Sequence, residues 1–292
     1  MDVWGRLKAC LDYPFEVALE TTGRCNARCD FCPHDEIERK NEYMSDEMFL
    51  RVIEQLKEIP QTHYFQITPH KVNEFLMDKK IFERIDMLLE ALPSAYIRIF
   101  TNLHMADDED IKRLCGVKRL SDLAISLNSL DKDEYKMIMG LDLDRTKRNI
   151  HKLLAYVRKN GLRMLTDKIL ISRVAQYNDG DSAFLRECEK EFAEYLDMLT
   201  IHVFPRENWI DYLPVETVIQ DNQPCPRWAE FQICCTGEVA FCCRDGRPSY
   251  PIGNIMENTV LEIYNKPEYR RLREEAPLRS QITPCRFCSV VY

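Results

Sequence analysis

Short apolar runs alternate with amphipathic helical patterns between residues 15 and 204, and this alternation limits the possible folds most strongly. Strands separated by helices of this size predict parallel pairing with helical crossovers, which defines the α/β class. Six strand–helix units can be identified, too few for a closed eight-stranded barrel. The predicted strands are Phe15–Glu20, His63–Thr68, Tyr96–Phe100, Leu123–Leu127, Lys168–Val174 and Leu199–Phe204. The predicted helices are Asp46–Ile59, capped by Ser45, Asp78–Leu92, Asp107–Leu114, Arg145–Asn160, ended by Gly161, and Ser182–Leu196.

Charge and hydropathy narrow the classes of function. The chain of 292 residues has a net charge of −8, which disfavours a nucleic-acid partner because such partners select basic surfaces. It has no run of 18 apolar residues and no signal-peptide pattern, so we expect no membrane span and a cytoplasmic location. In that reducing compartment the thirteen cysteines are predicted to be metal ligands or buried thiols rather than disulfides.

Three cysteines directly after the first predicted strand, Cys25, Cys29 and Cys32, have the spacing Cys-x3-Cys-x2-Cys. Three thiolates can hold three irons of a [4Fe–4S] cube and leave the fourth iron open. A zinc site is the alternative, but zinc favours paired Cys-x2-Cys motifs and four ligands. Three unrelated buried thiols are the other alternative.

This motif, with Phe31 before its last cysteine, resembles that of the radical S-adenosylmethionine (SAM) superfamily. The resemblance implies an open, partial (β/α)6 TIM barrel with the active site at the carboxyl ends of its strands. It also implies that SAM chelates the open iron and that electron transfer yields a 5′-deoxyadenosyl radical, which removes a hydrogen atom from a C–H group. A flavodoxin or ferredoxin is the expected reductant.

Contacts to SAM follow from the resemblance position by position. The family motif Gly-Gly-Glu-Pro after the second strand is represented here by Val72-Asn-Glu-Phe75, which retains only Glu74 as the predicted partner of the methionyl amino group. Phe31 is expected against the adenine, and the backbone around His34 is expected at its edge. The remaining predicted contacts are Thr101 and Asn102 after the third strand, Ser126 and Asn128 after the fourth, and Arg173 at the end of the fifth.

The composition changes near residue 221, and residues 221–292 hold seven of the thirteen cysteines. A hairpin around Gly237 and a helix over Val260–Glu275 are predicted. The Thr-Gly-Glu-Val-x-x-Cys242 and Pro-Cys285-x-x-Cys288 patterns resemble the SPASM/twitch extension of radical SAM enzymes. The resemblance implies one auxiliary [4Fe–4S] cluster bound by Cys225, Cys242, Cys285 and Cys288, while the spacing alone also allows a zinc ribbon. The predicted division is an N-terminal extension (1–14), the barrel (15–204), a linker (205–224) and the auxiliary-cluster domain (225–292).

Cys243 follows Cys242 directly, so one of the two cysteines is predicted to be the ligand. Neighbouring side chains on a strand point to opposite faces, and this parity would aim Cys243 toward the barrel mouth if Cys242 binds iron. A thiol there could donate a hydrogen atom to a carbon radical, and a buried structural cysteine is the alternative.

The reaction is predicted from the size of the chain and from the spare cysteine. Only 24 residues precede Cys25, which leaves no room for a separate peptide-binding module. The chain therefore resembles the branch that acts on small polar substrates of the aminoglycoside, aminocyclitol or sugar type. Epimerisation with Cys243 as hydrogen donor is the favoured prediction. A dehydrogenase that passes an electron to the auxiliary cluster and a peptide or protein maturase remain alternatives.

Overall fold

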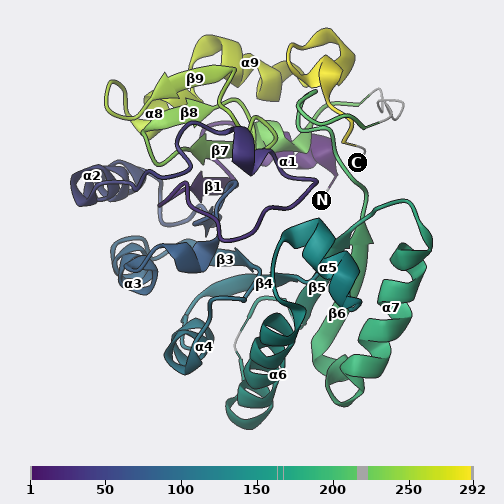
Figure 1. Cartoon of the computed structure of the whole chain (residues 1–292). Coiled ribbons are helices and arrows are strands. Elements are labelled where there is room, and N and C mark those ends of the chain that lie inside the picture. Colours follow the sequence, from purple (N-terminus) through teal and green to yellow (C-terminus); the bar gives the residue numbers. More distant parts are fainter. Residues whose placement is uncertain (1, 163, 167, 216–222, 291–292) are drawn as a thin grey trace.

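The computed structural model describes residues 2–162, 164–166, 168–215 and 223–290. It contains one nine-stranded sheet in the order β6-β5-β4-β3-β2-β1-β7-β8-β9 (Figure 1). The strands are β1 (Glu16–Leu19), β2 (Phe65–Thr68), β3 (Ala95–Thr101), β4 (Leu120–Ser126), β5 (Ile169–Val174), β6 (Leu199–Phe204), β7 (Glu230–Ile233), β8 (Glu238–Ala240) and β9 (Pro251–Asn254). The helices are α1 (Val3–Ala9), α2 (Asp46–Leu56), α3 (Ile81–Ala91), α4 (Asp108–Cys115), α5 (Lys132–Met139), α6 (Leu143–Asn160), α7 (Asp179–Glu191), α8 (Val260–Tyr264) and α9 (Pro267–Glu275).

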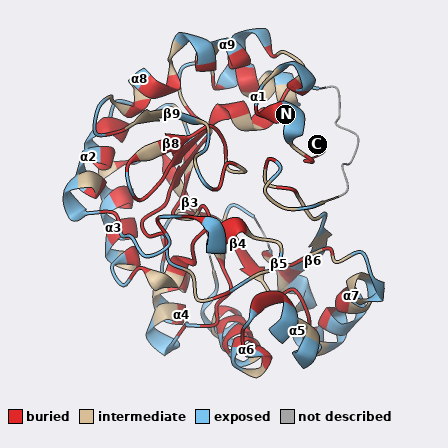
Figure 2. Cartoon of the chain, turned by 45° about the horizontal axis from the view of Figure 1, so that its top comes forward, coloured by how far each residue is buried: buried red, intermediate tan, exposed pale blue. Residues whose placement is uncertain are grey.

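Strands β1 to β6 are parallel and form the predicted open barrel of six strand–helix units. Alternate side chains point to opposite faces, so Ile97 and Ile99 of β3 are fully buried against the helices while Arg98 and Phe100 face the lumen. The helices show buried inner and exposed outer surfaces around the sheet (Figure 2). Among the described residues, no helix has the length and apolar character needed to span a bilayer.

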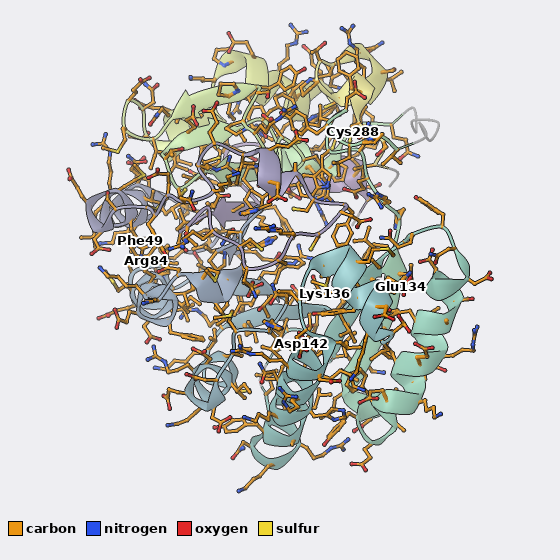
Figure 3. The ribbon with its side chains drawn as sticks, viewed as in Figure 1. Phe49, Arg84, Glu134, Lys136, Asp142 and Cys288 are labelled. Carbon is orange, nitrogen blue, oxygen red and sulfur yellow. The ribbon has the colours of Figure 1, made fainter. Side chains whose placement is uncertain are left out.

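Local sequence signals begin and end several helices. The Ser45 hydroxyl accepts a hydrogen bond from the Met48 amide at the start of α2, as predicted. Gly161 ends α6 with a φ of 79°, a conformation that glycine adopts without strain. Between α2 and α3, the Arg84 guanidinium lies 5.0 Å from the centre of the Phe49 ring (Figure 3) and donates to Asp78.

The C-terminal segment continues the barrel sheet. Strand β7 pairs in parallel with β1, and β8 and β9 follow in antiparallel order. Gly237 lies in the β7–β8 turn with a φ of 91°, as the sequence predicts. The N-terminal helix α1 packs on α9 beside this segment (Figure 1), where the Tyr264 hydroxyl donates to the Cys10 carbonyl at 2.7 Å. The N-terminal helix of the chain therefore packs against its C-terminal segment.

Helices α1 and α5 and strand β9 were not predicted, and two local predictions were wrong. The single helix predicted over Val260–Glu275 is two helices, since Pro267 begins α9 and has no amide hydrogen to continue α8. Strand β8 ends at Ala240, so Cys242 and Cys243 lie in a turn rather than on a strand. Residues 216–222 of the predicted linker and residues 291–292 of the predicted last domain lie outside the described part of the chain.

Candidate active site

The three cysteines of the first motif lie on the loop that follows β1, at the carboxyl edge of the barrel. All three are half-buried, and Cys29 is close enough to the other two that a negative charge on either raises its pKa, after burial, the larger cause. Helix α5 supports this loop, because the Arg28 amide donates to the Met139 carbonyl at 2.9 Å and the Asp30 amide to the Ile138 carbonyl at 3.0 Å. The loop is therefore fixed by backbone contacts on both sides of Cys29.

Glu74 lies beside this loop and is 3 % exposed. Its carboxylate accepts hydrogen bonds from the Thr101 hydroxyl at 2.5 Å and from the Asn102 amide at 2.8 Å. Asn102 in turn donates to Asn26, next to Cys25, at 2.9 Å. Burial raises the pKa of Glu74 despite these donors, so a cationic partner would stabilise its charged form. The structure thus joins Glu74, Thr101 and Asn102 to the cysteine loop.

Two further predicted SAM contacts, Phe31 and His34, lie on either side of Cys32. The Phe31 carbonyl accepts a hydrogen bond from the Trp209 indole at 2.8 Å. The His34 ring makes a 2.8 Å hydrogen bond with the Gly23 carbonyl, and its backbone amide is directed at the Cys32 sulfur. The backbone at His34 is therefore held close to the third cysteine.

The predicted contacts on β4 and β5 are not all free for a ligand. Ser126 ends β4 and is half-buried. Asn128 accepts from the Val174 amide at 2.8 Å through its side chain, with its backbone in the left-handed region at a φ of 63°. The Arg173 guanidinium is fully buried between Glu134, labelled on α5 in Figure 3, and Asp181 of α7. Because two carboxylates already neutralise Arg173, this geometry argues against it as a partner of the SAM carboxylate.

Four cysteines from three separate segments line one cavity beside β7. They are Cys225, Cys242, Cys285 and Cys288, the last labelled near the C-terminal end in Figure 3. Burial raises the pKa of Cys242 well above its usual value, and negative charge on Cys243 and on the other three cysteines would raise it further. These thiols therefore need a bound metal to become thiolates.

The residues around these thiols suit a negatively charged cluster. Arg227, Arg244 and Arg279 line the same cavity, together with Trp228 and Phe241. The guanidinium groups offset the charge that four thiolates and an iron–sulfur cube carry, and the aromatic walls exclude water. Among the residues that the structure describes, no three His, Cys, Asp or Glu side chains are grouped to hold a single metal ion.

Cys243 shares Arg227 and Arg244 with the auxiliary cavity, but Glu230 and Lys71 also act on it. Burial raises the pKa of Cys243, and the charges that act on it belong to Arg227, Glu230, Arg244 and Lys71. Arg227 and Glu230 line a cavity of about 540 Å³ at the amino ends of the barrel strands, opposite the cysteine loop, with Glu16, Gln66, Arg98 and Asp122. The prediction for Cys243 assumed that Cys242 and Cys243 lie on a strand, and this premise was wrong. On the turn, the surroundings of the two thiols still differ.

Comparison with known proteins assigns the family. The model of the radical SAM superfamily matches residues 19–171, which is just over half of the chain. The chain belongs to the radical SAM superfamily. A second model, the SPASM iron–sulfur cluster-binding domain, matches residues 225–289. The cofactors are therefore SAM, a [4Fe–4S] cluster and an auxiliary iron–sulfur cluster.

Solved structures of this superfamily share the fold at low sequence identity. BtrN in complex with AdoMet and 2-DOIA has a TM-score of 0.62 and 15% identity, over 95% of this chain and 93% of that one. Streptococcus suis SuiB bound to the precursor peptide SuiA has a TM-score of 0.67 and 16% identity, over 98% of this chain and 72% of that one. AnSMEcpe with bound AdoMet has a TM-score of 0.65 and 14% identity, over 90% of this chain and 82% of that one. A search of curated proteins gives no match.

Sequence reasoning missed the polar residues of the lumen and the linker residues 206–209. Glu16, Gln66 and Arg98 occupy polar positions of predicted strands and Asp122 directly precedes one, so strand parity could have placed the first three together. No local signal marks residues 206–209, because their partners lie far away in the sequence.

Proposed function

We propose that this radical SAM enzyme removes a hydrogen atom from a C–H group of a small polar substrate in the barrel lumen and epimerises that carbon. The observation that carries the proposal is the position of Cys243 on a turn at the carboxyl edge of the barrel, where the neighbouring Cys242 carbonyl accepts a hydrogen bond at 3.2 Å from Lys71, three residues before Glu74. When bound, the cluster and SAM supply a 5′-deoxyadenosyl radical that takes the hydrogen atom.

The lumen supports a substrate that carries hydroxyl and amino groups. Glu16 accepts from the Thr68 hydroxyl at 2.8 Å and from Arg98 at 3.2 Å, and Gln66 donates to Asp122 at 3.4 Å. Burial raises the pKa of Glu230, while Arg227, paired with it at 3.3 Å, lowers it, and Glu16 is paired with Arg98 at 3.2 Å. This pattern of carboxylates, amides and guanidinium groups matches an aminoglycoside, aminocyclitol or amino sugar better than an apolar molecule.

In the proposed step, Cys243 restores the hydrogen. The S–H bond breaks homolytically and a new C–H bond forms on the opposite face of the substrate carbon. The Cys243 sulfur is left as a thiyl radical, and one electron and one proton return it to the thiol. The electron comes from the reducing system, for which we expect a flavodoxin or ferredoxin. The substrate must be held so that only one carbon faces the thiol.

The test is turnover in deuterium oxide with an aminocyclitol or aminoglycoside panel. The epimerised product should carry one deuterium at the inverted carbon. Cys243→Ala should abolish product while iron content and substrate-dependent SAM cleavage persist, and Cys115→Ala, on α4, serves as the control. Normal product formation by Cys243→Ala would rule out this donor.

Two other reactions remain candidates. A dehydrogenase would yield a product two electrons more oxidised, with no solvent deuterium on carbon, and a Cys243→Ala variant would stay active. A peptide maturase would cleave SAM only with a peptide present. The similar structures include one bound to 2-DOIA and one bound to a precursor peptide, so both substrate classes belong in the assay.

A further inference from the structure

Four consecutive residues after β6 contact the loops of both cysteine sites. Arg206 donates to the Asp30 side chain at 3.0 Å and to its carbonyl at 2.6 Å, while Trp209 donates to the Phe31 carbonyl. Asn208 donates to the Phe287 carbonyl at 2.6 Å and accepts from the Ser289 amide at 3.0 Å. We call residues 206–209 the strap. The outer two residues hold the SAM-site loop, and Asn208 holds the auxiliary loop.

Arg244 connects the strap to both sites through its charge. Its guanidinium forms an ion pair with Glu207 and lies 5.1 Å from the centre of the Trp209 ring. It also lines the cavity of Cys225, Cys242, Cys285 and Cys288. Arg244 thus stands at the auxiliary site and one aromatic ring away from the Phe31–Cys32 backbone.

The position of Arg244 puts one positive charge beside both cysteine loops. The Trp209 ring that it contacts donates to the carbonyl of Phe31, the residue before Cys32, and Arg244 itself lines the auxiliary cavity. A positive charge beside a cluster stabilises the extra negative charge of its reduced form.

We propose that the Arg244–Glu207 pair is a shared electrostatic tuner that sets the reduction potentials of the SAM-binding and auxiliary clusters together. A fixed positive charge favours the reduced form, and Glu207 limits the effect. The inference rests on the family's two clusters and is independent of the substrate and of the role of Cys243.

The experiment is a redox titration of the reconstituted enzyme, followed by electron paramagnetic resonance. Added SAM identifies the signal of the SAM-binding cluster, because only that cluster has an open iron. Arg244→Gln should lower both midpoint potentials, with the reduction equilibrium falling about tenfold, or about 59 mV for one electron. Glu207→Gln should shift the potentials in the opposite direction, and Arg244→Lys should retain the wild-type values.

Arg244→Gln and Glu207→Gln break the same ion pair. If the pair had only a structural role, the two variants would shift the potentials in the same direction. Arg247→Gln is the matched control, since Arg247 lies on the same loop, stacks 3.7 Å from the centre of the Tyr212 ring and pairs with Glu36. Same-direction shifts for Arg244→Gln and Glu207→Gln, an equal shift for Arg247→Gln, or a change at only one cluster would overturn the proposal. If Arg244→Gln fails to load iron, the upward shift in Glu207→Gln decides it.

Discussion

The two cysteine sites are built in contrasting ways. The SAM site takes its three half-buried cysteines from one loop, and the buried carboxylate of Glu74 stands beside them. The auxiliary site takes four cysteines from three segments and encloses them with aromatic and guanidinium side chains. A single loop can hold a cluster and leave one position reachable, whereas an enclosed site depends on the whole C-terminal segment being folded. The first site therefore serves binding of a ligand, and the second is tied to stability.

The largest expected effect comes from the SAM site. Cys29→Ala should abolish 5′-deoxyadenosine formation and reduce iron from about eight to about four atoms per chain, because two thiolates do not retain this cube. The unfolding temperature should change little, since one loop holds the site. Iron analysis and product chromatography under strong reductant measure the result. SAM cleavage by Cys29→Ala would contradict the assignment of ligand binding to this loop.

A change at the auxiliary site should lower thermal stability more than a change at the SAM site. Cys242→Ala should lose about four irons and lower the unfolding temperature by about 10 °C, because the cluster joins three chain segments. Thermal denaturation under anaerobic conditions, run beside Cys29→Ala, provides the comparison. Equal losses of thermal stability in both variants would contradict it.

Glu74→Gln probes the open position of the SAM site. Loss of a buried charge partner should weaken SAM binding by roughly tenfold to a hundredfold without loss of iron. Burial raises the pKa of Glu74, so wild-type affinity should fall as acid protonates the carboxyl, and the variant should not share this fall. Titration with SAM at several pH values measures both effects. Glu83→Gln, at an exposed position of α3, is the control.

The smallest effect is expected at the strap. Asn208→Ala removes two side-chain hydrogen bonds to the auxiliary loop and should destabilise the protein by about 2–3 kcal/mol. A chelator should then remove auxiliary iron faster, while the SAM-binding cluster is lost at the wild-type rate. Asn160→Ala, on the surface at the end of α6, should behave as wild type. Faster loss of both clusters would show that the strap supports them equally.

The sequence predicted the barrel well, because its strands are apolar runs bounded by amphipathic helices. Strand β6 has the predicted limits, and the other five barrel strands differ by a few residues at their ends. The cysteine loop was predicted from its Cys-x3-Cys-x2-Cys spacing, and Glu74 from the resemblance to the family motif after the second strand. The β7–β8 hairpin was also predicted, but the pairing of β7 with β1 was not. Parallel pairing of β7 with β1 joins residues more than two hundred positions apart, and no local pattern encodes it.

Two expectations at the site depended on surroundings that the sequence did not reveal. Arg173 was expected at SAM because it ends a strand, and α5, which was not predicted, brings Glu134 to it. The parity argument for Cys243 assumed a strand that ends at Ala240. The charges around Cys243 depend on the lumen and on Lys71, which donates to the Cys242 carbonyl at 3.2 Å. Such long-range neighbours are not visible in the sequence around the cysteine.

The pairing of β7 with β1 has a practical consequence for dissecting this protein. Cutting the chain after β6 would leave the first barrel strand with bare amide and carbonyl groups along its open side. This exposed strand edge would pair with other copies of the fragment in intermolecular sheets. An isolated barrel fragment should therefore precipitate and could not be used to study the SAM site alone.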